Sequence, residues 1–321
     1  MSWLVFAFSG PLLWAISTHI DKYLVEKYFK HALAAALLVF TALIGLFTLL
    51  FIWYFVPSVV ALDLASAALM ASSGVLYMGG LLFYLRALQG EEASTVAPFF
   101  QAAPFFGFVL GYLVLGETLS LTQMAGGILI VAGTTLVSLR RGGAQTRLRR
   151  RLVASMLAAA LCLASSALVF KVFALDDAFW PTTFWMFVGE AFFGAGLLAV
   201  PSYRAQFLAL LRANPGAVVS INAANELVNL GGGLGNRYAL LLAPLSLVQA
   251  VGSTTTLFVF AFGVLLSIYS PSIGREDLSA PELLRKGAAA VLVAIGAWLV
   301  SGSRPDASPS PGLLMIVVAG S

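Results

Sequence analysis

Residues 32–55 read ALAAALLVFTALIGLFTLLFIWYF, a run that contains no charged side chain. A helix that crosses the hydrocarbon core of a bilayer needs about 20 predominantly apolar residues. This run is long enough to form one such span. Strands of membrane β-barrels alternate apolar and polar residues, whereas this run is apolar on all sides. We therefore expect a membrane helix.

The composition of the whole chain agrees with this interpretation. Of 321 residues, 60% are hydrophobic and 10% are charged, whereas soluble domains are about 25% charged. A soluble protein could not bury so much apolar surface, which excludes a soluble enzyme, a nucleic-acid binder and a disordered chain. The sequence predicts an all-α integral membrane protein with ten transmembrane helices, at residues 3–20, 32–55, 64–85, 93–114, 121–139, 152–173, 180–200, 216–236, 243–268 and 285–301.

Basic residues mark a boundary within the chain and predict its orientation. Residues 140–151 contain six arginines and no acidic residue. We therefore expect a first five-helix repeat at 1–139, an Arg-rich linker at 140–151, a second five-helix repeat at 152–301 and a tail of unknown role at 302–321. Of the 18 Lys and Arg residues, 15 fall in odd-numbered connections or directly beside them. Because positive charge marks the cytoplasmic side, both termini are expected outside the cell membrane.

The two halves repeat each other in sequence. The matched residues keep their order: Ser94, Val96, Phe106, Phe108, Gly111 and Gly133 correspond to Ser246, Val248, Phe258, Phe260, Gly263 and Gly296. Five spans per half insert the second half upside down relative to the first. Inverted repeats of this kind build secondary carriers with a site near the midplane. We expect two inverted repeats around a central cavity; a duplication without a transport role is the alternative.

Several short motifs carry a family resemblance. They are, in order, Gly10, Trp14, Ala15, Ser17 and Lys22; Tyr84, Ala87, Leu88, Ala93, Val96 and Pro98; Pro104 and Leu115-Gly116-Glu117; Gly126, Gly127 and Gly133; and residues 243–249 with Glu276 and Lys286. With these motifs the chain resembles the EamA-type ten-helix carriers of the drug/metabolite transporter (DMT) superfamily over residues 3–301.

The resemblance implies two five-helix halves that enclose a substrate cavity. It also implies export of amino acids, other metabolites or drugs, or exchange of nucleotide sugars or triose phosphates. This chain departs from the family pattern in one motif, because Gly274-Arg275-Glu276 stands where the second copy of Gly116-Glu117 is expected. Members of the family are also commonly drawn with both termini in the cytosol, opposite to the orientation that the basic residues predict.

Glu226 is the strongest candidate for a functional residue, because it lies near the middle of its predicted span. Asn222, Glu226 and Asn229 share one helix face, and Asn225 flanks them. This face suits hydrogen bonds to a polar solute, and the carboxylate suits a proton or a cationic group. The alternative is a polar clamp between helices.

Glu190 is the second candidate, since it also lies deep in a predicted span. Burial in a low dielectric favours the protonated form of a carboxyl group, so Glu190 is a candidate for proton exchange during transport. A carboxyl group that is hydrogen-bonded to a neighbouring helix is the alternative.

Other candidates come from polar, aromatic and basic residues of the spans. Gln101 on the fourth span and Gln249 and Ser253 on the ninth are expected to line the cavity, unless they serve helix packing. The remaining candidates are Trp14, Tyr77 and Tyr84 for stacking on substrate and Lys22 and Lys171 for binding an anion. Interfacial aromatic belts and snorkelling lysines are the respective alternatives.

Groups that would serve catalysis or metal binding are missing from the sequence. The only histidines, His19 and His31, are expected to be solvated near the first loop. No Cys, His and carboxylate cluster has metal-ligand spacing, so we expect no catalytic residue, no metal and no cofactor. The glycine run 231–233 is expected to loosen the helix beside Glu226.

The sequence therefore predicts a secondary transporter, a permease or exporter of a small polar or amphipathic metabolite or drug. Its driving force would be the substrate gradient or proton exchange through Glu226 or Glu190. Expected partners are the small-molecule substrate, protons and membrane lipids but no nucleic acid, with the protein acting as a monomer or a homodimer. The alternatives are a membrane-embedded lipid-handling protein or enzyme, and a receptor or scaffold, which would carry a larger soluble region.

Overall fold

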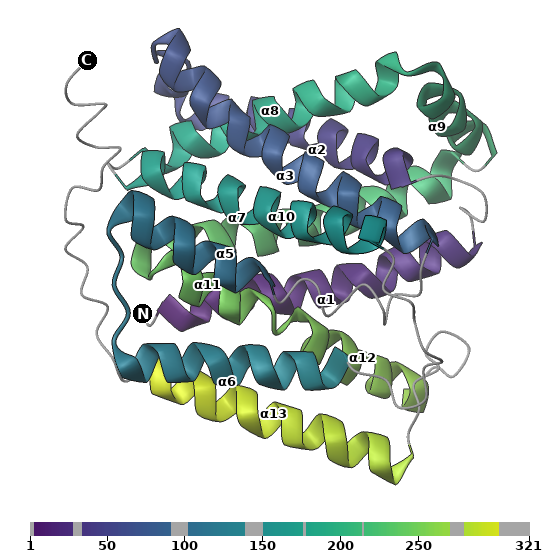
Figure 1. Cartoon of the computed structure of the whole chain (residues 1–321). Helices are drawn as coiled ribbons and strands as arrows, with labels where there is room; N and C mark the ends of the chain where they lie inside the picture. Colours follow the sequence, from purple (N-terminus) through teal and green to yellow (C-terminus); the bar gives the residue numbers. More distant parts are fainter. Residues whose placement is uncertain are drawn as a thin grey trace. The chain divides into compact units, whose positions relative to one another are not determined.

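A computed structural model describes residues 3–27, 34–90, 102–138, 150–175, 178–213, 215–269 and 279–301 (Figure 1). Every regular element in these ranges is a helix. The α-helices of the first part are α1 (Trp3–Lys27), α2 (Ala34–Phe55), α3 (Leu64–Gly90), α5 (Ala102–Leu110) and α6 (Leu121–Ser138), with a 3-10 turn η1 (Pro57–Val60) and a π-helical turn η3 (Gly111–Leu115). Those of the second part are α7 (Arg150–Ala174), α8 (Phe179–Ala199), α9 (Pro201–Ala213), α10 (Pro215–Leu242), α11 (Leu245–Gly252), α12 (Thr255–Tyr269) and α13 (Ala280–Ser301).

Seven helical segments of the described chain are long and apolar enough to cross a membrane. The protein is therefore a multi-pass integral membrane protein. Two shorter apolar helices, at 102–115 and 121–136, overlap the predicted fourth and fifth spans, 93–114 and 121–139, but are shorter than these spans. Helix α10 has 28 residues but is not among the seven, because the polar residues of its central turns lower its hydropathy.

Three local features differ from the sequence-based expectation. Helix α9 occupies a stretch that was expected to be a connection. The predicted ninth span is divided at residues 253–254 into α11 and α12. The glycine run 231–233 does not interrupt α10, which continues to Leu242.

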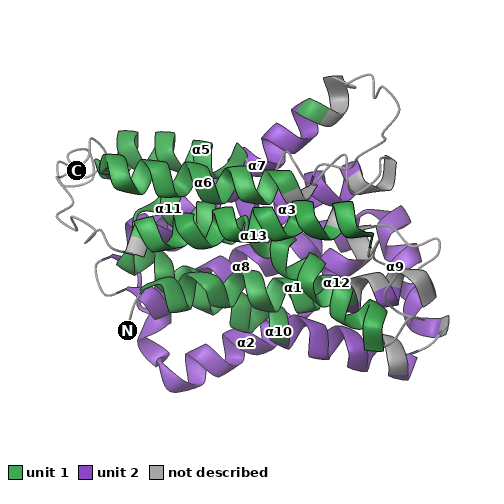
Figure 2. Cartoon of the chain, turned by 90° about the horizontal axis from the view of Figure 1, so that it is seen from below, with its two compact units in different colours: residues 1–19, 93–153, 228–321 green, residues 20–92, 154–227 purple. Residues whose placement is uncertain are grey.

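The chain forms two compact units, coloured separately in Figure 2. Unit 1 comprises residues 1–19, 93–153 and 228–321, and unit 2 comprises residues 20–92 and 154–227. Each unit therefore combines segments from both halves of the sequence.

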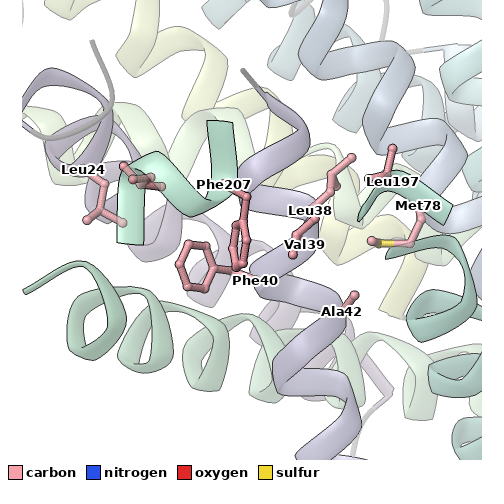
Figure 3. Packing of buried hydrophobic residues seen from close by; sticks show 9 residues of the cluster. Leu24, Leu38, Val39, Phe40, Ala42, Met78, Leu197 and Phe207 are labelled. Atoms are coloured by element: carbon pink, nitrogen blue, oxygen red, sulfur yellow. The ribbon is translucent and has the colours of Figure 1, made fainter. Parts of the chain in front are cut away.

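An apolar core holds unit 2 together and includes one side of α9. Phe207 and Leu210 of α9 are buried with Leu38 and Phe40 of α2. The rings of Phe40 and Phe207 are in contact, with centroids 5.1 Å apart and planes tilted by 60° (Figure 3). The exposed side of α9 carries Arg204, so α9 is an amphipathic helix whose apolar side covers α2.

Within unit 2, α3 and α8 touch backbone to backbone. A Cβ atom at Gly74 of α3 would overlap the carbonyl oxygen of Met186 on α8, and one at Gly189 of α8 would overlap that of Ala71 on α3. Since the residue numbers run in opposite directions along the contact, the two helices are antiparallel.

Within unit 1, α6 and α13 pack side by side (Figure 1). A Cβ atom at Gly126 would lie 2.7 Å from the carbonyl oxygen of Gly296, and one at Gly133 would lie 2.8 Å from that of Ala289. These pairings make α6 and α13 antiparallel. Gly133 and Gly296, which correspond in the sequence comparison of the two halves, both lie in this contact.

One packing arrangement recurs in both units. In unit 2, a Cβ atom at Gly80 of α3 would lie 2.9 Å from Leu163 and 3.1 Å from the carbonyl oxygen of Ala159, both on α7. In unit 1, a Cβ atom at Gly232 of α10 would lie 3.1 Å from Trp14 and 3.3 Å from the carbonyl oxygen of Gly10, both on α1. Gly231 and Gly232 thus allow a close approach to Leu13, Trp14 and Gly10 of α1, whereas a Cβ atom at Gly233 would meet nothing within 4 Å.

The first turn of α3 is capped by Asp63, which lies outside the apolar span. Its Oδ1 accepts a hydrogen bond of 2.9 Å from the backbone N–H of Ser66. This bond, followed by one from the Ser66 hydroxyl, lowers the pKa of Asp63 below its usual value of 3.8. The ionised Asp63 therefore stabilises the start of α3 fully at pH values above its ordinary pKa. This stabilisation is lost as the pH falls through the lowered pKa of the folded protein.

We expect the protection of the Ser66 amide against hydrogen exchange to fall as the medium is acidified below about pH 4. In Asp63→Asn the cap is retained by a neutral side chain, so this loss should disappear. Hydrogen exchange measured by mass spectrometry against pH checks the prediction. An equal loss of protection in both proteins would mean that another group titrates.

Candidate functional site

Glu226 lies on α10 within unit 2 and is buried, with 8% of its surface exposed. Its Oε1 accepts a hydrogen bond of 2.9 Å from the hydroxyl of Thr41 on α2. The next residue, Leu227, is 64% exposed. At this turn α10 therefore points a polar residue inward and an apolar residue outward.

The three amides predicted to accompany Glu226 differ in how deeply they are buried and in the unit to which they belong. Asn222 and Asn225 are each 1% exposed and belong to unit 2. Asn229 is half-buried on the segment of α10 that belongs to unit 1. The buried polar side chains that α10 contributes to unit 2 are thus one carboxyl group and two amides.

Glu190 of α8 is 1% exposed. Like Glu226, it lies against α2. Its Oε2 is 4.0 Å from the position that a Cβ atom of Gly45 on α2 would take. Thr41 and Gly45 are four residues apart, so they share one face of α2 and are separated by about 6 Å along its axis. Glu226 and Glu190 therefore lie against successive turns of the same face of α2.

Gly194 continues this contact between α2 and α8, since a Cβ atom there would overlap Ala42. Together with the pair of Gly45 and Glu190, this pairing makes α2 and α8 antiparallel. At Gly45 itself a Cβ atom would make only ordinary contacts, 3.4 Å from Phe187 and 4.0 Å from Oε2 of Glu190.

Thr41 and Gly45 were not singled out in the sequence. The available signal was the pattern of α2, where Thr41, Gly45 and Thr48 follow the spacing i, i+4, i+7. This spacing puts a small and polar face on an otherwise apolar helix. Such a face predicts an approach to polar groups of neighbouring helices.

The other candidates of unit 2 lie on α7 and α3. Lys171 of α7 is 5% exposed and so is buried within the protein. Tyr77 of α3 is half-buried and packs against the apolar core of unit 2. Tyr84, two turns further on α3, is also half-buried.

The candidates of unit 1 make contacts among α1, α5, α6, α10 and α11. Trp14 lies against Gly232. The Cγ atom of Gln249 lies 3.2 Å from the position of a Cβ atom at Gly107 of α5. Ser253, at the end of α11, donates to the carbonyl of Ala250 and lies 3.2 Å from the hydroxyl of Thr134 on α6. Gln101 and the side chain of Lys22 lie outside the described part of the chain.

His19 differs from the expectation of a solvated side chain. It is half-buried, and its Nε2 lies 3.0 Å from the carbonyl oxygen of Val259 on α12. His31 lies outside the described residues. In the ranges that the structure describes, no group of three His, Cys, Asp or Glu side chains is arranged to hold a metal ion.

The motif Leu115-Gly116-Glu117 has a structural explanation. Gly116 adopts φ of 65° at the end of the π-helical turn η3, a conformation that favours glycine. The chain then turns so that Oε2 of Glu117 accepts a hydrogen bond of 2.8 Å from the backbone N–H of Leu245. Glu117 therefore caps the N-terminus of α11, where a negative charge is favourable.

Gly111 leaves the space that this cap needs, because a Cβ atom there would lie 2.6 Å from Oε2 of Glu117. We expect Gly111→Ala to displace the carboxylate and lower the free energy of unfolding by about 1–2 kcal/mol, the usual cost of a lost cap. Unfolding in detergent measures the effect. Glu117→Ala removes the same cap, so the double variant should be less destabilised than the sum of the two. Full additivity would contradict the prediction.

The comparisons with known proteins agree with this architecture. Residues 1–139 match the family model of the EamA-like transporter family, which belongs to the drug/metabolite transporter superfamily. The resemblance predicted from the motifs is thus confirmed for this part of the chain. No curated protein matches the sequence.

Solved structures also match, and one crystal structure aligns over 92% of this chain and 94% of its own, with a TM-score of 0.61 and 16% sequence identity. At this identity the likeness concerns the fold alone.

Proposed function

We propose that this protein is a secondary transporter that moves a small polar or amphipathic metabolite or drug across the cell membrane by alternating access. The observation that carries the proposal is the buried carboxyl group of Glu226, held by Thr41 and flanked by Asn222 and Asn225. A charged side chain at the centre of a bilayer costs about 2.5–3.5 kcal/mol on insertion scales. Such residues usually line the path of a substrate or an ion.

In this proposal the ten spans form two inverted repeats, 1–139 and 152–301, joined by the linker 140–151 and followed by the tail 302–321. An inverted repeat makes equivalent helices antiparallel. The antiparallel pairs of α2 with α8 and of α6 with α13 support it, as does the recurrence of the Gly80 packing at Gly232. The basic residues support an orientation with both termini outside.

The proposed substrate cavity lies between the repeats and takes its polar groups from both. Transport is driven by the substrate gradient or by proton exchange through Glu226 or Glu190, and the Glu226 carboxylate suits a proton or a cationic group of the solute. The substrate contacts would come from Asn222, Asn225, Asn229, Gln101, Gln249, Ser253, Trp14, Tyr77, Tyr84, Lys22 and Lys171.

The test is flux through proteoliposomes that contain the purified protein. Labelled amino acids, sugars, nucleosides and quaternary-ammonium dyes are offered with and without an imposed pH gradient. Selective flux that follows the gradient is expected for a carrier that uses Glu226 or Glu190. Selective flux that ignores the gradient would retain the carrier and remove proton coupling. Absence of flux for every solute would contradict the proposal.

A further inference from the structure

The hydroxyl of Thr41 has two hydrogen-bond acceptors within reach. One is Oε1 of Glu226 at 2.9 Å, and the other is the carbonyl oxygen of Leu37, one turn back on α2, at 3.3 Å. A hydroxyl group carries a single proton and two lone pairs. Thr41 therefore donates fully to only one of the two oxygens at a time. Its hydroxyl oxygen can also accept a hydrogen bond.

We propose that Thr41 is a positioning residue that adapts to the protonation state of Glu226. When the carboxyl group is ionised, the hydroxyl donates to Oε1. When the carboxyl group has taken up a proton, the hydroxyl turns to the carbonyl of Leu37 and accepts a hydrogen bond from the protonated Oε1. The proton that is exchanged belongs to Glu226 throughout, and Thr41 keeps its own.

This inference rests on the proposed function, because it matters for transport only if Glu226 changes its protonation state during the cycle. Both arrangements leave the carboxyl group hydrogen-bonded. An unsatisfied polar group in an apolar interior is costly. Because the Thr41 hydroxyl can donate or accept, it lowers the free-energy cost both of protonating and of deprotonating Glu226. A residue without a hydroxyl at position 41 would leave the ionised form without this donor.

The charged groups around Glu226 are few. Helix α2 carries none, and the one charged residue of α3, Arg86, is exposed and donates to Tyr203. The charged side chains buried with Glu226 in the described part of unit 2 are Glu190 of α8 and Lys171 of α7. Further along α10 itself lies Arg237, in the segment that belongs to unit 1.

The decisive variant is Thr41→Val, which keeps the branched shape and removes the hydroxyl. A hydrogen bond to a charged group contributes enough to move a titration midpoint by about 1–2 pH units. Losing a donor disfavours the ionised form, so we expect the midpoint of the pH profile of flux to move upward by this amount. Thr41→Ser keeps the hydroxyl and should keep the midpoint.

Thr48 offers a matched control on the same face of α2. Its hydroxyl donates to the carbonyl of Ile44 at 3.1 Å, the same backbone bond that Thr41 has available. Thr48→Val therefore removes an equivalent hydroxyl without a carboxyl partner, and the midpoint should remain that of the unmodified protein.

Infrared titration separates a failure of this inference from a failure of the proposed function. The C=O stretch of a protonated carboxyl group reports Glu226 directly, and Glu226→Gln identifies its band. We expect Thr41→Val, but not Thr41→Ser or Thr48→Val, to shift the midpoint of that band, whether or not a transported solute is known. An unchanged midpoint in Thr41→Val, or an equal shift in Thr41→Ser, would overturn the inference.

Discussion

Gly189→Ala should strongly destabilise the folded protein, because α3 and α8 touch backbone to backbone at this residue. The new Cβ atom would overlap the carbonyl oxygen of Ala71 and would lie 3.2 Å from the backbone nitrogen of Val75. Backbone atoms cannot turn aside as the end of a side chain can, so the two helices would have to separate. Overpacking of a well-packed interior typically costs about 1–3 kcal/mol, and we expect at least the upper end here.

Gly196→Ala is the matched control, since it lies on the same helix and a Cβ atom there meets nothing within 4 Å. It should be neutral or slightly stabilising, because alanine favours a helix over glycine by about 1 kcal/mol. The yield of monodisperse protein and its melting temperature in detergent measure both variants. Equal behaviour of the two variants would show that the α3 and α8 backbones do not touch as described.

Glu226→Gln should eliminate accumulation driven by a pH gradient while leaving the protein folded. The glutamine keeps an oxygen for the hydrogen bond from Thr41, but it cannot bind or release a proton. One pH unit corresponds to a factor of about ten, so a gradient of about two units supports at most about 100-fold accumulation with one proton exchanged. In the variant this ratio should fall to about one, with residual downhill flux.

The companion variants Glu190→Gln and Glu117→Gln make this result specific. Glu190→Gln tests whether the second buried carboxyl group shares the coupling. Glu117 lies in unit 1 and caps α11, so its substitution should leave gradient-driven accumulation intact. Undiminished accumulation in Glu226→Gln would remove this residue from the coupling mechanism.

The long helices were predictable because length and apolar composition alone determine whether a segment can span a bilayer. Helix α9 was not predicted because Arg204 and Arg212 resemble a charged connection. The pattern of Tyr203, Phe207 and Leu210 nevertheless has helical spacing, and burial of that side against α2 stabilises the helix.

The division of the predicted ninth span also has a local cause. Ser253, Thr254 and Thr255 each donate their hydroxyl to the carbonyl three residues earlier. Such bonds compete with the regular backbone bonds of a helix. Four consecutive hydroxyl residues after Gly252, at 253–256, were the available signal.

The candidate site was predictable only as far as one helix determines it. Asn222 and Glu226 share a face by their spacing, and the structure buries both. The partner Thr41 comes from α2, far away in sequence, and the approach of Glu190 to Gly45 depends on how α8 packs on α2. Contacts of this kind depend on tertiary packing, which one sequence without its relatives does not specify.

Counterflow in proteoliposomes tests the central claim most directly. Vesicles are loaded with an excess of the unlabelled solute that the flux measurement selects, and a trace of the labelled solute is added outside. A carrier that works by alternating access returns to the outside loaded, so the label should accumulate transiently above equilibrium and then decline. A monotonic approach to equilibrium would contradict alternating access.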